Sequence, residues 1–129
     1  KAALEFNPNI VVIKLGTNDT KPQNWKHGAD YLDDYKSMIS IFSNLTSKPK
    51  IYICLPVPVV ESRWGITDDI VNEKIIPTLR KISNQTKCKI IDLNTPFNNK
   101  HNLIPDKVHP NAKGATIIAK EVAKSILNS

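Results

Sequence analysis

Three short apolar runs, each followed by a stretch with helical spacing, constrain the fold of this chain more than any other feature of its sequence. The runs span Ile10–Leu15, Lys50–Leu55 and Cys88–Leu93. Apolar residues then recur at three- and four-residue steps over positions 29–45, 67–85 and 111–127. Strands that alternate with helices in this way form a parallel sheet with helices on both faces. We therefore predict an α/β fold, with the first strand covered on both sides.

The second helical stretch carries two local signals. Thr67 is a suitable N-cap, because its hydroxyl can accept a hydrogen bond from a free backbone N–H of the first turn. Pro77 lies inside the same pattern, and it should kink the helix because it lacks the N–H that a helical bond requires. The segment from Lys21 to Gly28, before the first helical stretch, has the character of a loop.

Length and charge limit the class of protein. The 129 residues suit a single domain, and no apolar run approaches the roughly 20 residues that span a bilayer. The formal charge is +6, but the lysines are scattered, which favours a solvated basic surface over nucleic-acid binding. Cys54 and Cys88 lie in predicted strands without a second ligand at metal-binding spacing, so we interpret them as buried small hydrophobic residues.

The stretch Pro105–Asn111 holds the first candidate for chemistry. Asp106 precedes His109 by three residues, and a helical pattern begins directly after them. A carboxylate at this spacing can hold an imidazole in one tautomer and stabilise the charge that it gains with a proton. The helix dipole disfavours an imidazolium at a helix N-terminus, which favours a neutral ring that can act as a base. The alternative is a surface Asp beside a His that packs at the start of the helix.

Asn18 is the second candidate, in the turn Gly16-Thr17-Asn18-Asp19 after the first predicted strand. One interpretation is an ordinary turn residue, with Asp19 bracing the turn through backbone N–H groups. The other is an oxyanion donor, because a side-chain amide aimed at a developing oxyanion contributes roughly 3–4 kcal/mol. The working groups of parallel sheets lie on loops at the carboxyl ends of the strands. We therefore expect Asn18 and His109 to face one edge of the sheet.

These two motifs, in this order and each after a parallel strand, resemble two sequence blocks of the SGNH, or GDSL-type, hydrolases. The turn that ends in Asn18-Asp19 is similar to the third block of that family, and Asp106-x-x-His109-Pro110 is similar to the fifth. The resemblance covers essentially the whole chain. It implies a flavodoxin-like three-layer α/β/α sandwich that is incomplete at the amino terminus.

The resemblance also implies roles for single residues. His109 would be the general base that activates a serine and later protonates the leaving alcohol. Asp106 would orient His109, and Asn18 would donate a hydrogen bond in the oxyanion hole. The implied reaction is ester hydrolysis, with no metal and no organic cofactor.

The chain departs from the family where the nucleophile is expected. No serine stands in a Gly-Asp-Ser or Gly-x-Ser-x-Gly setting, and the block that supplies a glycine N–H to the oxyanion hole is also absent. The chain leads from Lys1 into a strand without a signal peptide, as expected of a mature form or a fragment. We therefore predict that residues 1–129 are the carboxyl-terminal part of one SGNH hydrolase domain, without esterase turnover alone. The Ile10–Leu15 strand would then expose an edge, to be paired with the missing portion or with a second copy.

Three side chains on loops near the expected site are candidates for substrate binding, namely Trp25, Arg63 and Trp64. Aromatic rings beside polar groups suit the face of a sugar, and the segments around both tryptophans look most like carbohydrate acetylesterases of this family. The alternative is that both rings only pack the wall of the site.

The sequence thus indicates an esterase that deacetylates a glycan, as against a non-catalytic glycan-binding or structural relic of the same fold. The expected partner is a small ester or an acetylated carbohydrate, with no nucleic acid and no membrane. The compartment stays open, with a secreted or periplasmic location favoured over the cytoplasm.

Overall fold

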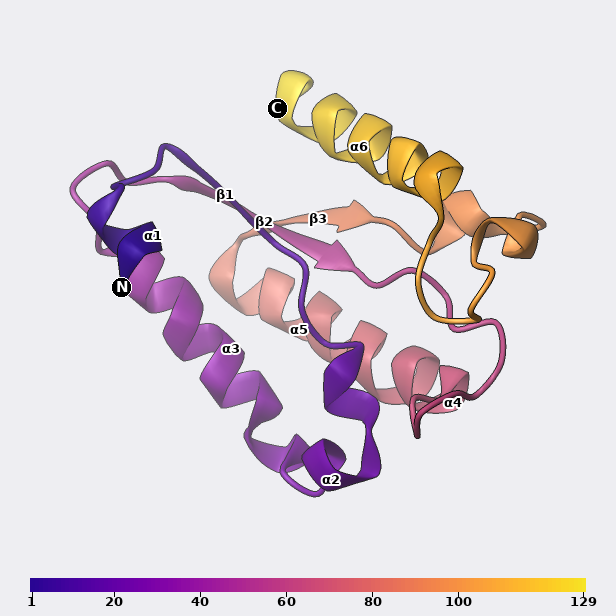
Figure 1. Cartoon of the computed structure of the whole chain (residues 1–129). Coiled ribbons are helices and arrows are strands. Elements are labelled where there is room, and N and C mark those ends of the chain that lie inside the picture. Colours follow the sequence, from indigo (N-terminus) through magenta and orange to yellow (C-terminus); the bar gives the residue numbers. More distant parts are fainter.

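The computed structural model describes the whole chain, from Lys1 to Ser129, around a parallel sheet of three strands (Figure 1). The strands are β1 (Ile10–Ile13), β2 (Lys50–Leu55) and β3 (Lys89–Asp92), in the spatial order β1-β2-β3. In their parallel register, Ile13 lies beside Ile53 and Ile53 beside Ile90. β2 is therefore the central strand, and all three strands lie where the apolar runs predicted them.

A short helix precedes β1, and helices follow each strand, as the alternation predicts. They are α1 (Ala2–Glu5), α2 (Pro22–Trp25), α3 (Gly28–Ser43), α4 (Asp68–Ile70), α5 (Ile76–Thr86) and α6 (Ala112–Leu127). α3 and α5 cover one face of the sheet, and α6 covers the other (Figure 1). The three-layer α/β/α arrangement is confirmed. None of these helices combines the length and the apolar character needed to cross a membrane.

Alternate side chains of β2 enter two separate hydrophobic clusters. Ile51, Ile53 and Leu55 join a cluster with residues of α3 and α5, whereas Tyr52 and Cys54 join another beneath α6. Full burial of one such aliphatic side chain contributes about 1.5–3 kcal/mol. The side chains of β2 therefore stabilise the packing of the helices on both faces of the sheet. Cys54 is a free cysteine, and burial raises the pKa of its thiol to about 11. This pKa agrees with its interpretation as a small hydrophobic residue.

The helical stretch after β2 is divided by a π-helical turn, Val71–Ile75, between α4 and α5. Pro77 lies in the first turn of α5, and the wider turn before it accommodates the missing N–H. The predicted kink at Pro77 therefore takes the form of this π-helical turn. Thr67 is the N-cap residue of α4, as predicted, but its hydroxyl makes no capping bond and is buried without a partner. The neighbouring Asp68 instead accepts a hydrogen bond of 3.2 Å from the backbone N–H of Val59.

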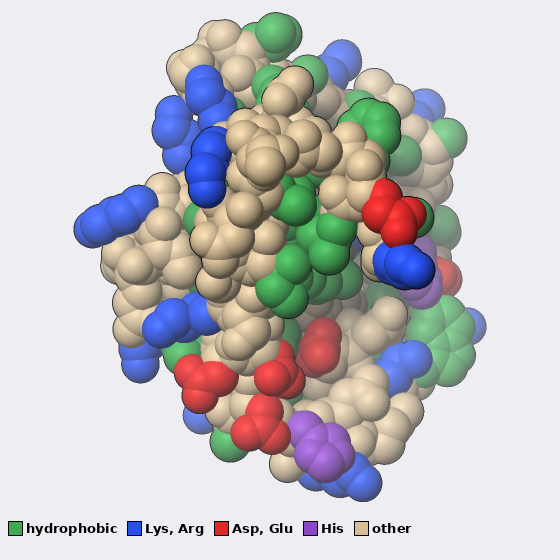
Figure 2. Space-filling model, turned by 90° about the vertical axis from the view of Figure 1, so that its left-hand side faces the viewer, with side chains coloured by type: hydrophobic (Ala, Val, Ile, Leu, Met, Phe, Trp, Pro, Cys, Tyr) green, Lys and Arg blue, Asp and Glu red, His purple; other side chains and the backbone are tan.

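β1 has no neighbouring strand on its outer side. Ile10 and Val12 are 44% and 38% exposed, and they line a mainly apolar hollow of about 530 Å³ together with Phe6, Leu15 and residues of α3. Figure 2, turned to this side of the molecule, shows hydrophobic side chains gathered in a hollow. The prediction that the first strand is covered on both faces is wrong for this chain, because α6 packs against β3 and leaves β1 open. The predicted open edge is present.

Candidate active site

The loop before α6 brings Asp106 and His109 into direct contact. Oδ2 of Asp106 lies 2.7 Å from Nδ1 of His109. Oδ1 of Asp106 accepts hydrogen bonds from the backbone N–H groups of Val108, at 2.9 Å, and His109, at 2.5 Å. Lys107, between Asp106 and Val108, adopts a left-handed backbone with φ of 74°, which folds the loop back on itself. The loop therefore presents the carboxylate to both the backbone and the ring of the following residues.

These bonds determine the charge of Asp106 and the proton position on His109. The backbone N–H of His109, then that of Val108, and also the bond to the ring hold the pKa of Asp106 at about 2, below its ordinary value of 3.8. An ionised carboxylate at Nδ1 favours the tautomer with its proton on Nδ1, which leaves Nε2 free to accept a proton. The side chain of His109 is 66% exposed. The ring is therefore accessible, and its Nε2 can take a proton from a group that enters the site.

Asn18 begins a short 3-10 turn, Asn18–Thr20, directly beyond the carboxyl end of β1. The turn is anchored by Thr20, a buried residue whose hydroxyl donates to the carbonyl of Thr17 at 2.7 Å. The carbonyl of Asn18 accepts a bond of 2.8 Å from the side-chain amide of Asn24. The backbone at Asn18 is thus held from both sides, while Asn18 itself remains exposed.

Asn18 and His109 line the same cleft, which has a volume of about 200 Å³. The cleft also contacts Gly16, Val57 and Pro110, which belong to three different loops at one end of the sheet. The parallel strands bring the Asn18 turn and the Asp106–His109 loop together, as expected for groups at carboxyl ends. No serine is among the residues that line this cleft.

Two of the three residues expected to bind substrate lie beside His109. The ring of Trp64 is 5.9 Å from the ring of His109, between centroids, with an angle of 47° between their planes. The guanidinium of Arg63 lies over the Trp64 ring, 4.8 Å from its centroid, and its Nη1 donates to the carbonyl of Asp106 at 3.4 Å. The long loop after β2 is therefore in contact with the Asp106–His109 loop.

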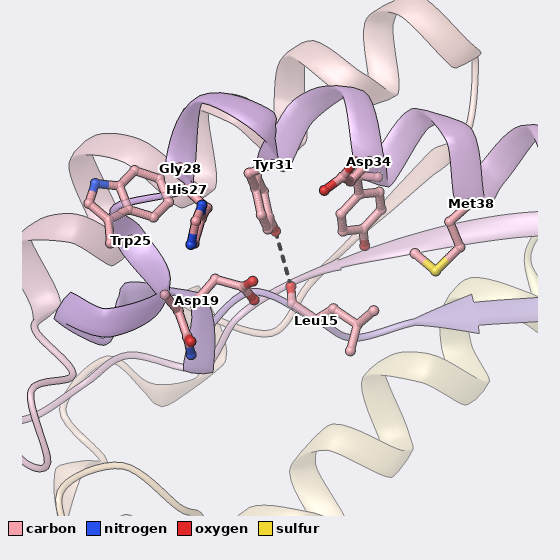
Figure 3. A pocket seen from close by; sticks show the side chains of 10 residues that line it. Leu15, Asp19, Trp25, His27, Gly28, Tyr31, Asp34 and Met38 are labelled. Carbon is pink, nitrogen blue, oxygen red and sulfur yellow. Dashed lines mark hydrogen bonds between the residues drawn. The ribbon is translucent and has the colours of Figure 1, made fainter.

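Trp25 lies in a different place. It ends the short helix α2, so the interpretation of residues 21–28 as a loop needs correction. Its ring forms part of a pocket of about 360 Å³ between the end of β1 and α3, where Asp19, Tyr31 and Asp34 also point (Figure 3). This pocket shares Leu15 and Asp19 with the cleft of His109, so the two hollows are neighbours.

Sequence reasoning missed the polar group that Tyr35 brings to this second pocket. Tyr35 belongs to the apolar stripe of α3, and such spacing is typical of the core. Tyr35 does belong to the core, but its buried hydroxyl has no hydrogen-bond partner. Burial also raises the pKa of Asp19, although a hydrogen bond from its own backbone N–H partly lowers that pKa. A Tyr at a core position, whose hydroxyl needs a partner, was the one signal available.

Comparison with known proteins decides the family. The sequence matches the GDSL-like Lipase/Acylhydrolase family over residues 1–117. The chain belongs to this family. It is 35% identical, over 144 aligned residues, to the acetylxylan esterase of Xylanibacter ruminicola. That alignment covers 98% of this chain and 30% of the relative, so this chain spans less than a third of the curated relative's length.

Solved structures share the GDSL-type, or SGNH hydrolase, fold with this chain. The acetyl xylan esterase AlAXEase matches with a TM-score of 0.77 and 23% identity, covering 95% of this chain and 69% of that one. Axe2, an acetylxylan esterase from Geobacillus stearothermophilus, matches with a TM-score of 0.75 and 18% identity, covering 95% and 61%. A carbohydrate esterase family 3 protein from Talaromyces cellulolyticus matches at 0.76 and 20%, covering 98% and 60%.

Proposed function

We propose that this chain carries the base and the oxyanion-binding part of an ester hydrolase that removes acetyl groups from a glycan. The observation that carries the proposal is the cleft shared by Asn18 and His109, with Asp106 bonded to Nδ1 of His109. Membership of the GDSL-like family supports ester hydrolysis. The name of the relative from Xylanibacter ruminicola, acetylxylan esterase, supports an acetylated glycan as substrate.

The proposed reaction assigns one task to each residue. Nε2 of His109 takes the proton of a serine hydroxyl while the serine oxygen attacks the acetyl carbonyl, and Asp106 stabilises the imidazolium that forms. The side-chain N–H of Asn18 donates to the oxyanion of the tetrahedral intermediate, a contribution of about 2.7–4 kcal/mol for one such donor. His109 then gives the proton to the sugar oxygen as the ester bond breaks. Water repeats the cycle and releases acetate and free serine.

The nucleophile is proposed to come from outside residues 1–129. No serine lines the cleft, and no Gly-Asp-Ser stands in the sequence. In this proposal the chain is the carboxyl-terminal part of one hydrolase domain and does not turn over alone. The open outer side of β1, with its apolar hollow of about 530 Å³, supports a missing amino-terminal portion or a second copy as the structure that pairs there.

The proposed substrate contacts lie on two sides of the cleft. Arg63 and Trp64 lie beside His109, so they would contact the sugar unit that carries the ester. Trp25 lies in the neighbouring pocket, so it would contact another unit of the same glycan. Aromatic rings suit the apolar faces of sugars, which supports a carbohydrate rather than a lipid.

The first test is the sequence encoded upstream of Lys1. A Gly-Asp-Ser block after an apolar strand supports the esterase, whereas its absence supports a non-catalytic glycan-binding relic of the same fold. The second test compares the chain alone with the longer protein on acetylated xylo-oligosaccharides, with acetate release as the measurement. We expect turnover only from the longer protein.

Two histidine variants of the longer protein test the mechanism. His109→Ala should lower kcat by at least about a thousandfold, because the loss of a triad member removes most of the catalysis. His101→Ala is the matched control, because His101 is also exposed and lies on the segment before the same loop. Acetate release by residues 1–129 alone, or equal rates for the two variants, would contradict the proposal.

A further inference from the structure

The long loop after β2 ends in a tight hairpin turn whose conformation is unusual for its sequence. Arg63 and Ile66 exchange two backbone hydrogen bonds, of 3.1 and 2.8 Å. The two residues between them, Trp64 and Gly65, both have positive φ, at 53° and 77°. This is the pattern of a type I′ turn, which favours Asn, Asp or Gly at both positions. A bulky aromatic residue at Trp64 is therefore held in a conformation that its own preferences oppose.

The base of this turn is fixed in the protein interior. Ile66 is 1% exposed and belongs to a buried cluster with Val59, Val71 and Val108. Val108 directly precedes His109 in the chain. The turn and the catalytic loop therefore rest on the same apolar cluster.

The turn contacts the Asp106–His109 loop on one side and the start of α2 on the other. The Trp64 ring packs against His109, and Arg63 bonds to the carbonyl of Asp106. On its other side, Gly65 lies so close to Pro22 that a Cβ on Gly65 would stand 2.6 Å from Cδ of Pro22. Pro22 follows the Asn18–Thr20 turn by two residues. The turn therefore lies between the loop of Asn18 and the loop of His109.

We propose that the Trp64-Gly65 turn is a spacer that positions the two halves of the site. Trp64 holds the ring of His109 so that Nδ1 stays on Asp106. Gly65 lets the tip of the turn seat against Pro22, which sets the distance from His109 to the Asn18 turn. Trp64 and Gly65 are thus positioning residues. The strained backbone at Trp64 places the ring there, as strain at a functional site commonly does.

This inference rests on the proposed roles of Asn18 and His109, but its test measures geometry in the chain of 129 residues and needs no turnover. The experiment is heteronuclear NMR on 15N-labelled protein. Long-range 1H–15N correlations report the tautomer of His109, with His27 and His101 as internal references. Backbone amide signals report the position of the Asn18–Thr20 turn. A failed esterase assay therefore does not affect the outcome.

The first variant is Trp64→Asn, which removes the ring but supplies a residue that the type I′ turn prefers. We expect a folded protein in which His109 loses its single Nδ1–H tautomer and shows a mixture, while the Asn18–Thr20 amides stay in place. An unchanged tautomer of His109 would refute the role of Trp64.

The second variant is Gly65→Asn, which tolerates positive φ but adds a Cβ against Pro22. We expect the amide signals of the Asn18–Thr20 turn to shift, and we expect the added substitution Pro22→Ala to restore them, because it removes the Cδ atom in the way. Lys87→Asn is the matched control, since Lys87 is also a left-handed position, with φ of 62°, but is exposed at the end of α5 and not part of the Asn18 turn. Unmoved Asn18–Thr20 amides in Gly65→Asn, or no rescue by Pro22→Ala, would overturn the inference. Trp64→Asn keeps the inference open to refutation even if Gly65→Asn does not fold.

Discussion

Replacing Gly16 by Ala should destabilise the connection between β1 and Asn18, and with it the whole fold. Gly16 has φ of +133°, a backbone conformation that is closed to residues with a Cβ. An added Cβ would also stand 2.7 Å from the hydroxyl of Tyr31 and 2.9 Å from Cγ2 of Ile75. Ile75 is completely buried, so it cannot move aside without disturbing the core beneath α3 and α5.

The two effects can be given magnitudes. A residue forced into such a backbone region costs about 1–3 kcal/mol, and one extra carbon in a packed interior costs about 1–3 kcal/mol. We therefore expect the free energy of unfolding to fall by about 2–6 kcal/mol, a large part of the roughly 5–15 kcal/mol that holds a typical domain together. Within the destabilised fold, the loop that carries Asn18 should be the part most affected.

The assay is urea unfolding followed by far-ultraviolet circular dichroism, with Tyr31→Phe as the companion variant. Tyr31→Phe removes the nearer of the two contacts and a long hydrogen bond of 3.4 Å to the carbonyl of Leu15. In the Tyr31→Phe background, Gly16→Ala should cost about 1 kcal/mol less than it does in the wild type, because the contact with the hydroxyl is gone. The backbone cost remains. A Gly16→Ala protein within about 0.5 kcal/mol of the wild type, the range of ordinary surface changes, would refute the reasoning.

Three further predictions concern pH, a helix cap and the open edge. Because the folded pKa of Asp106 is depressed to about 2 from 3.8, its carboxylate stabilises the fold above about pH 4. The stability difference between wild type and Asp106→Asn should therefore disappear as the pH falls toward 2, in urea unfolding at a series of pH values. Asn111→Ala should lower the stability by about 1 kcal/mol, because the side chain of Asn111 accepts a hydrogen bond of 2.9 Å from the backbone N–H of Gly114 at the start of α6. A thermal midpoint equal to that of the wild type would contradict this. Val12→Lys, on the exposed face of β1, should reduce self-association of the chain in analytical ultracentrifugation, whereas Lys at the exposed position Ile41 should not.

Much of the fold could be predicted because its signals are local. The apolar run of β2 and the helical spacing of α6 depend only on neighbouring residues, and both elements form where they were predicted. Asn111 caps α6 for the same reason. The failures involve partners distant in sequence. Thr67 makes no cap bond where Asp68 bonds to Val59 instead.

The candidate site shows the same division. The Asp106–His109 contact spans three residues, so the motif alone predicts it, and the bond of 2.7 Å between their side chains is present. The separation of Trp25 from Trp64 could not be predicted. Both residues lie on segments after strands, and only the packing of those segments places Trp64 at His109 and Trp25 in the neighbouring pocket.

The amino-acid sequence by itself determined the alternation of strands and helices, the two motifs and the starting point of the last helix, because each follows from side chains only a few positions apart. Only the tertiary structure decided that Asn18 and His109 share a cleft, and that the Trp64-Gly65 turn lies between their loops. The distances between such loops depend on the stacking of strands and on the shape of buried clusters. These arise only when segments far apart in the chain pack together.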